Sequence, residues 1–369
     1  MRNSKLSVMI VDDSSTARRI LTDIINRHPM LEVSATAADP YEAVESLKTA
    51  SPDVMVLDVR MPRMDGITFL KKLMRIKPLP VVMCSSFTKE GSRVSMECLE
   101  KGAVDTIAKP EIATPKQMRE LEMRIHDTLL SAVLARRSSN GRTASSDSVK
   151  SSLETSISIG TNEKLSADVI LPPPNPDLVK RIPKTSKVVG VGASTGGVDA
   201  IRTVLESLPT DSPGIAIAQH MPEQFTEPFA QRLNEVCQIE VREAKKGDRL
   251  EPGLALVSPG SHHLVLKRSG KNYFVDTVEG PLVNRHRPSV DVLFRSVASA
   301  AGPNAIGVIL TGMGDDGAVG LREMKEAGAR NLAQDAATSV VFGMPNEAIK
   351  QGGVDEVVSL YQLSSFIRS

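Results

Sequence analysis

The sequence contains no tryptophan, and aromatic residues make up only 3% of its 369 residues. Its charges nearly cancel, with 45 lysines and arginines against 44 aspartates and glutamates, and it has no long basic block. Proteins that bind nucleic acids usually combine strongly basic surfaces with aromatic side chains on which bases stack. The composition therefore argues against a nucleic-acid-binding protein.

Cysteine and long apolar runs are also scarce. Cys84, Cys98 and Cys237 are odd in number and show no C-x-x-C spacing, which argues against disulfides or a thiolate metal site and fits a reducing cytosol. No apolar run approaches the roughly 20 residues of a membrane-spanning helix. The run LSVMIV near the N-terminus ends at Asp12 and Asp13 and is too short for a signal peptide. We therefore expect a cytoplasmic protein without membrane insertion.

The order of apolar runs predicts two domains joined by a linker. Residues 1–135 alternate short apolar runs with helical patterns, which is typical of a parallel sheet with helices on both faces. Residues 136–183 show no such period, since RRSSNGRTASSDSVKSS is polar and LPPPNP is rich in proline. This composition predicts a linker that is flexible at first and stiffer at the prolines. Residues 184–369 resume the alternation.

The second domain adds a β-rich insertion to its strand–helix pattern. KVVGVGAS, GIAIAQH and NAIGVILTG are predicted strands, each followed by a helical pattern. Between the second and third of these strands stand four β-rich segments: IEVREAK, GLALVSPG, HLVLKRS and NYFVDTV. RSGKN is a turn signal between the last two segments. We therefore predict two α/β domains with doubly wound parallel sheets, the second Rossmann-like with a β-hairpin-rich insertion.

Polar side chains follow several predicted strands of the first domain. Ligands of a parallel α/β sheet bind beyond the carboxyl ends of its strands, where we place Asp12, Asp13, Asp58, Ser85 and Lys109. Three carboxylates repel one another unless a hard cation such as Mg²⁺ lies among them, and a lysine beside them can hold a phosphoryl group. Each aspartate alone is better explained as a turn residue, but the whole set favours such a site.

VDD, LDVRMPRMDG, SS and KP, in this order, resemble the receiver domain of two-component response regulators over residues 6 to about 130. The resemblance implies a flavodoxin-like fold in which Asp58 accepts a phosphoryl group from a histidine kinase. It also implies Mg²⁺ binding by Asp12, Asp13 and Asp58, and contact with the phosphoryl group by Ser85 and Lys109. One position departs from the pattern, because Thr106 stands where many receivers carry an aromatic switch residue.

GASTG, residues 192–196, matches the G-x-S-x-G nucleophile elbow and places Ser194 on a sharp turn between a strand and a helix. The segment also invites comparison with a dinucleotide-binding loop. However, the third glycine of G-x-G-x-x-G would fall at Thr195, and the next strand ends in Gln219 and His220 instead of an acid. The pattern therefore favours a nucleophilic serine over a cofactor loop.

A serine nucleophile needs a base and an acid that orients the base. His220 is the histidine that ends the strand directly following the Ser194 unit. GMGDDG offers Asp315 and Asp316, between which spacing alone does not choose, and its glycine-rich turn leaves backbone N–H groups for an oxyanion hole. His286, in NRHRP, is predicted to lie in a basic surface loop that contacts an acidic partner or substrate.

GASTGG, QHM, HRPSVDVLF and LTGMGDDG resemble the catalytic domain of the chemotaxis protein-glutamate methylesterases. Together with the receiver, the resemblance covers nearly the whole chain except the linker. It implies Ser194 as nucleophile, His220 as base and Asp316 as the orienting acid, because the second acidic position of the family's GMGxDG pattern is the constant one. The Met313 backbone N–H, with Thr195 beside the nucleophile, is the implied oxyanion hole.

The same resemblance implies a phosphorylation-activated serine hydrolase that acts in sensory adaptation. It would demethylate glutamate γ-methyl esters and deamidate glutamines on methyl-accepting chemoreceptors, with a chemotaxis histidine kinase as phosphodonor. Mg²⁺ is expected in the receiver, no cofactor in the esterase, and recruitment to chemoreceptor arrays in the cytoplasm. The alternative is a response regulator whose second domain is a non-enzymatic adaptor, and the complete set of serine, histidine and aspartate counts against it.

Overall fold

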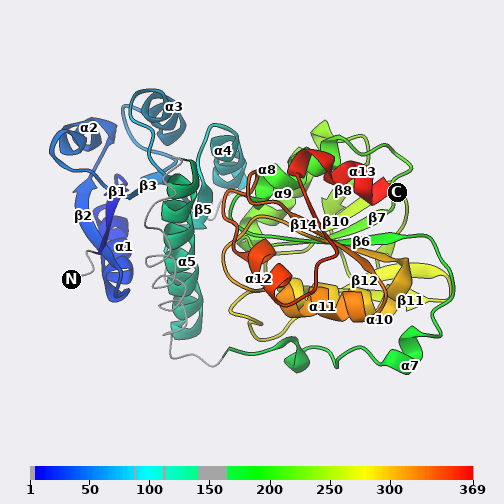
Figure 1. Ribbon diagram of the computed structural model, residues 1–369. Coiled ribbons are helices and arrows are strands. Elements are labelled where there is room, and N and C mark those ends of the chain that lie inside the picture. The colour runs from blue at the N-terminus through cyan, green and yellow to red at the C-terminus, as the bar shows by residue number, and fades with distance from the viewer. Residues whose placement is uncertain (1–4, 87–88, 111–113, 140–163, 369) are drawn as a thin grey trace. The chain divides into compact units, whose positions relative to one another are not determined.

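The computed structural model describes residues 5–86, 89–110, 114–139 and 164–368 (Figure 1). The chain divides into two compact units, Met1–Asn140 and Gly141–Ser369, each built around its own sheet. In the described ranges, no helix is both long and apolar enough to cross a membrane.

The first unit is a five-stranded parallel sheet in the order β2-β1-β3-β4-β5, as the flavodoxin-like prediction requires. Its strands are β1 (Leu6–Val11), β2 (Leu31–Ala37), β3 (Val54–Asp58), β4 (Val81–Ser85) and β5 (Asp105–Ala108). Its helices are α1 (Ser15–Arg27), α2 (Pro40–Thr49), α3 (Gly66–Ile76), α4 (Lys89–Glu100) and α5 (Pro115–Ser139). The central β3 and β4 are buried along their whole length, so their sequences are nearly continuous apolar runs. The edge strand β2 instead alternates more buried and more exposed residues.

The second unit has a seven-stranded parallel sheet in the order β15-β14-β13-β6-β7-β10-β8. Its strands are β6 (Val188–Ala193), β7 (Gly214–Gln219), β8 (Glu240–Glu243), β10 (Leu254–Val257), β13 (Ala305–Ile309), β14 (Arg330–Gln334) and β15 (Glu356–Val358). From residue 197 onward its α-helices and 3-10 helices (η) are α8 (Gly197–Glu206), α9 (Glu223–Val236), α10 (Val290–Ala301), η2 (Gly302–Asn304), α11 (Ala318–Glu326), α12 (Met344–Lys350), η3 (Leu360–Gln362) and α13 (Leu363–Arg368). The Rossmann-like prediction is confirmed by this parallel order.

The β-rich insertion contributes to two sheets. β11 (His263–Ser269) and β12 (Asn272–Val278) form the predicted antiparallel hairpin, and β9 (Arg249–Leu250) pairs with β12. The other two runs of the insertion, β8 and β10, extend the main parallel sheet instead of forming a second hairpin. β10 is buried along its length between two parallel neighbours, so its apolar residues are covered there.

Residues 164–183, which the sequence places in the linker, are packed against the second unit and contain the short helices η1 (Ala167–Val169) and α7 (Pro176–Val179). Val179 belongs to the core cluster around α10, and the Asn304 side chain donates a hydrogen bond to the Pro183 carbonyl at 3.0 Å. Part of the predicted linker 136–183 is thus anchored to the second unit by single apolar side chains, without any periodic pattern in its sequence. Residues 140–163 of the predicted linker lie outside the described ranges.

Helix α10 lies close against strand β6 because the strand carries glycines. A Cβ added to Gly192 would stand 2.1 Å from Val290 Cγ1, and one added to Gly190 would stand 3.3 Å from Phe294 Cδ1. This close approach brings the first residues of α10 to the carboxyl edge of the sheet, next to the turn that carries Ser194.

Candidate active site

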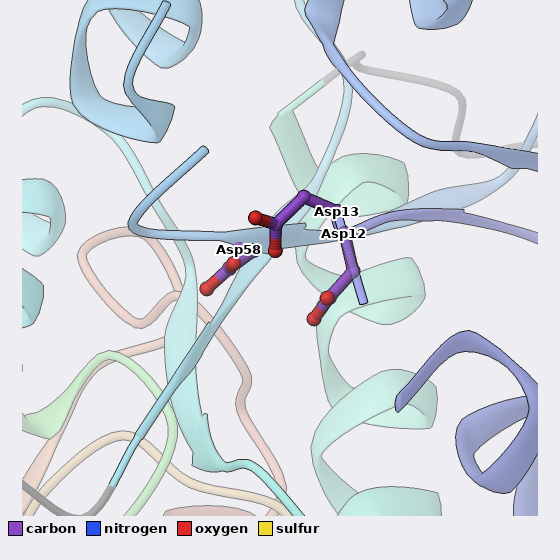
Figure 2. A group of neighbouring side chains, drawn as sticks. All are labelled: Asp12, Asp13 and Asp58. Carbon is purple, nitrogen blue, oxygen red and sulfur yellow. The ribbon is translucent and has the colours of Figure 1, made fainter. Parts of the chain in front are cut away.

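Three carboxyl groups gather at the carboxyl edge of the first sheet (Figure 2). Asp12 and Asp13 follow β1, and Asp58 is the last residue of β3. One oxygen from each lies within 4.8 Å of the others, with Asp12 and Asp58 buried and Asp13 exposed. All the donors are oxygens, as Mg²⁺ prefers, and the exposed Asp13 leaves one side of the group accessible.

Lys109 joins this acidic group from the end of β5. Its Nζ lies 2.9 Å from Asp12 Oδ2 and 2.7 Å from Asp58 Oδ2, while its backbone N–H donates to the carbonyl of Ser85 at 2.8 Å. Burial raises the pKa of Asp58 to about 6, the hydrogen bond from Lys109 opposes this rise, and the charge of Asp12 adds to it. The five residues selected from the sequence therefore meet at one edge of the first sheet.

Ser194 lies on a strand–turn–helix connection in the second unit. It follows β6, and α8 begins three residues later after Gly196, whose φ of 79° is in the left-handed region that favours glycine. A Cβ on Gly197 would stand 2.1 Å from Gln219 Oε1, so a larger residue would collide there. The backbone of the serine is held by a hydrogen bond from its N–H to the Thr311 carbonyl at 3.0 Å. This is the geometry of a nucleophile elbow.

His220 occupies the corresponding position on the neighbouring strand. β6 and β7 pair in parallel, and the His220 backbone N–H donates to the Ala193 carbonyl at 3.1 Å, directly beside Ser194. The His220 ring places Nε2 at 2.8 Å from Asp316 Oδ2. Its Nδ1 is buried and has no hydrogen-bond partner within the described residues. One ring nitrogen is thus fixed by a carboxylate, and the other is left to accept a proton.

Asp316, which stands two residues before α11, is 1% exposed and accepts hydrogen bonds from the first turn of α10. Besides His220, its hydrogen-bond donors are Ser289 Oγ (2.8 Å), the backbone N–H groups of Val290 (2.7 Å) and Asp291 (3.2 Å), and Asn284 Nδ2 (3.0 Å). Burial alone would raise the pKa of Asp316, but the hydrogen bond and charge of His220, followed by the charge of His286 and the Asn284 amide, hold it well below its usual range. A helix N-terminus favours the anion in the same way.

The two adjacent aspartates have different environments. Asp316 contacts His220, whereas the exposed side chain of Asp315 pairs with Lys164. The neighbouring turn approaches the nucleophile at Gly312, where an added Cβ would stand 2.7 Å from Ser194 Cβ.

His286, which the sequence places in a basic surface loop, is partly exposed and lies against His220. Its ring is stacked on that of His220, with centroids 3.7 Å apart and 10° between the planes. Asn284 and Ser289, which bind Asp316, were missed because they stand 32 and 27 residues before it in the chain, and no local pattern shows that this stretch returns to Asp316. The one available signal was Ser289 as the N-cap before the helical run VDVLF.

With this geometry established, comparisons with known proteins identify the family. Residues 189–367 match the CheB methylesterase family and residues 8–121 the response regulator receiver domain. A protein-glutamate methylesterase/protein-glutamine glutaminase of Geobacter metallireducens is 53% identical, covering 96% of both chains. The chain belongs to this methylesterase family. It is therefore a hydrolase of glutamate methyl esters and glutamine amides in proteins, preceded by a receiver domain.

Two further relatives extend the comparison. A protein-glutamate methylesterase/protein-glutamine glutaminase of Rhizobium johnstonii is 51% identical over 98% of this chain and 96% of its own length. The crystal structure of the Thermotoga maritima CheB methylesterase catalytic domain is 35% identical and covers 50% of this chain and 98% of its own, with a TM-score of 0.48.

Proposed function

We propose that Ser194, His220 and Asp316 carry out the hydrolysis, and that the substrates are glutamate γ-methyl esters and glutamine side chains of methyl-accepting chemoreceptors. The supporting observation is the His220 ring, which is bonded through Nε2 to a buried carboxylate and keeps Nδ1 without a partner among the described residues, one strand away from Ser194. This arrangement supplies a nucleophile, a base and an orienting acid.

In the proposed first step, Ser194 Oγ attacks the γ-carbonyl carbon while His220 Nδ1 takes the hydroxyl proton. The resulting imidazolium keeps its Nε2–H directed at the Asp316 carboxylate and returns the Nδ1 proton to the leaving group, which departs as methanol or ammonia. Water then attacks the acyl-enzyme, again losing a proton to His220, and releases a free glutamate. The backbone N–H of Met313, with Thr195 beside the nucleophile, is the proposed donor set for the oxyanion.

We assign phosphoryl transfer from a chemotaxis histidine kinase to Asp58. Asp12, Asp13 and Asp58 fit Mg²⁺ by their donor chemistry, and the ion would neutralise phosphoryl oxygens in the site. Ser85 would contact the phosphoryl group, and Lys109, already within 2.7 Å of Asp58, would pair with it. Recruitment of the protein to chemoreceptor arrays belongs to the same proposal, since its substrate would be concentrated there.

The decisive experiment is methanol release from methylated receptor membranes by the wild-type chain and Ser194→Ala. Loss of the nucleophile should lower turnover by about 10⁶-fold if the three residues act as a unit. Ser207→Ala, on the exposed end of α8, is the matched control and should keep wild-type turnover. If Ser194→Ala retained more than a few per cent of turnover, the nucleophile would be another residue. Binding to receptors with no turnover by either chain would favour the non-enzymatic adaptor.

A further inference from the structure

Residues 280–288, which we call the His286 loop, hold partners of both His220 and Asp316. Asn284 Nδ2 donates to Asp316 Oδ1 at 3.0 Å, and the His286 ring stacks on the His220 ring. Asn284 has a φ of 48°, in the left-handed region that residues with a Cβ disfavour. The loop therefore needs contacts from outside itself to keep this conformation.

Those contacts come from residues 164–171, which we call the strap and which the sequence places in the linker. The Asn284 backbone N–H donates to the Leu165 carbonyl at 2.9 Å. A Cβ on Gly280 would stand 2.3 Å from Ile170 Cδ1, so the strap lies directly on the loop. A small apolar cluster joins strap, loop and their neighbours: Ala167, Ile170, Leu171, Val265, Val278, Val283 and Val292.

An arginine of α10 binds the strap by hydrogen bonds. Arg295 is 4% exposed, and its Nη1 donates to Asp168 Oδ1 at 2.5 Å and to the Leu171 carbonyl at 3.0 Å. Its Nη2 lies 2.6 Å from Glu323 Oε1, so the guanidinium links the strap to α11. A buried arginine that lost its strap partners would leave donors without acceptors, which favours the attached state of the strap.

We infer that the strap is a positioning element of the esterase, which holds the His286 loop so that Asn284 and His286 keep Asp316 and His220 aligned. The inference rests on the catalytic roles proposed above. It makes the end of the interdomain segment part of the catalytic machinery, since its contacts reach the orienting acid through one residue, Asn284. At its other end the strap pairs Lys164 with Asp315, the neighbour of that acid.

The chemistry predicts a change in pH dependence as well as in rate. The Asn284 amide stabilises the Asp316 carboxylate, so its loss makes the carboxylate more basic and favours the protonated form of His220. Since His220 must be neutral to act as base, the acid limb of kcat/KM should move to higher pH. Among the described residues, the other titratable groups facing this pair include His286, His263 of β11, Asp291 of α10 and Asp315. They are unchanged in the variants below.

The test uses the full chain, with and without acetyl phosphate, and measures methanol release from methylated receptor membranes. The pH is varied between about 5 and 9, roughly the range in which a histidine titrates. Asn284→Ala should lower kcat roughly 10- to 100-fold and Asp168→Asn about three- to tenfold, both with the acid limb moved upward and KM little changed. Asp177→Asn is the matched control, because this aspartate is also exposed and also follows a capping residue, Asn175. It should leave rate and pH profile unchanged.

Asp168→Glu should restore part of the rate, because it keeps a carboxylate for Arg295. If Asp168→Asn matched Asp177→Asn in kcat and acid limb, or lowered only the melting temperature, the strap would have no positioning role. Failure of the catalytic proposal itself would appear separately, as turnover by Ser194→Ala in the same assay.

Discussion

Asp316 keeps its charge although its side chain is buried. Burial favours the protonated form of a carboxyl group, but Asp316 accepts hydrogen bonds from His220, Ser289, Asn284 and two backbone N–H groups of α10. Its pKa is therefore held well below the usual range. It remains an anion throughout the pH range in which a histidine titrates, so it can orient the neutral His220 ring and stabilise the imidazolium.

This difference in environment predicts unequal effects for the two adjacent aspartates. Asp316→Asn removes the acceptor of the His220 Nε2–H and should lower kcat about 10⁴-fold, the cost observed for an amide in this role in a serine protease triad. Asp315→Asn removes an exposed ion pair with Lys164 and should cost less than about tenfold. Methanol release per folded enzyme checks the ranking. The opposite order would assign the orienting role to Asp315.

Asp58→Ala should take up no labelled phosphate from acetyl phosphate with Mg²⁺, because the proposed acceptor is gone. Without Mg²⁺, the Asp58 carboxyl group has a pKa raised to about 6, chiefly by burial. In the metal-free chain it should therefore lose its proton as the pH rises through this value, which NMR of its carboxyl carbon measures. Lys109→Met removes a hydrogen bond that lowers this pKa, so the titration should move to higher pH. Lys71→Met, on the exposed face of α3, is the control and should leave the titration unmoved.

At the residue scale, the sequence predicted what local motifs can show. Ser194 stands in a strand–turn–helix whose glycines are required by the geometry, and His220 and Asp58 stand at strand ends, where the chain must place ligand-binding groups. Asn284 and the stacking of His286 were not predictable, because their contacts depend on how a long loop returns to the sheet edge.

At the scale of elements, strand β6 and helix α10 are coupled through glycine. Gly192→Ala would place a Cβ 2.1 Å from Val290 Cγ1, and the Val290 backbone N–H donates to Asp316. We expect a loss of about 1–3 kcal/mol in the free energy of unfolding, with reduced kcat, because α10 must shift. Denaturant unfolding and methanol release measure both. Gly270→Asn is the control, since this turn glycine has open space around it and asparagine tolerates its φ of 59°.

The predicted strands correspond to real ones because buried parallel strands need continuous apolar runs. The pairing of the strands was less predictable. β8 and β10 pair within the main sheet, because strands distant in the sequence, and not the sequences of β8 and β10 themselves, determine which neighbours they have. Residues 164–183 were assigned to the linker because they lack a period, yet Ala167 and Val179 are buried in the second unit. One or two anchoring side chains leave no periodic signal.

On the scale of the whole molecule, a receiver and a hydrolase share one chain. Phosphorylation of Asp58 can change esterase activity only if the active and inactive states of the full chain differ in the free energy of the phosphorylated site. Differences of this kind typically correspond to about 5- to 150-fold in an equilibrium. We therefore expect acetyl phosphate with Mg²⁺ to raise methanol release by the full chain within or above this range.

The same reasoning predicts how isolated fragments behave, and the strap decides where the fragment should begin. Residues 164–369 keep the strap and should be more active on receptors than the unphosphorylated full chain if the unphosphorylated receiver inhibits the esterase. Residues 184–369 lose the burial of Ala167 and Val179 and the Asp168 partner of Arg295, so this shorter fragment should melt earlier and turn over more slowly than the longer one. Methanol release and thermal unfolding of both fragments, beside the full chain with and without acetyl phosphate, measure these effects.

If fragment 164–369 were no faster than the unphosphorylated full chain, the receiver would recruit the enzyme to its substrate and would not inhibit it. If the two fragments had equal activities, the strap would not belong to the catalytic unit.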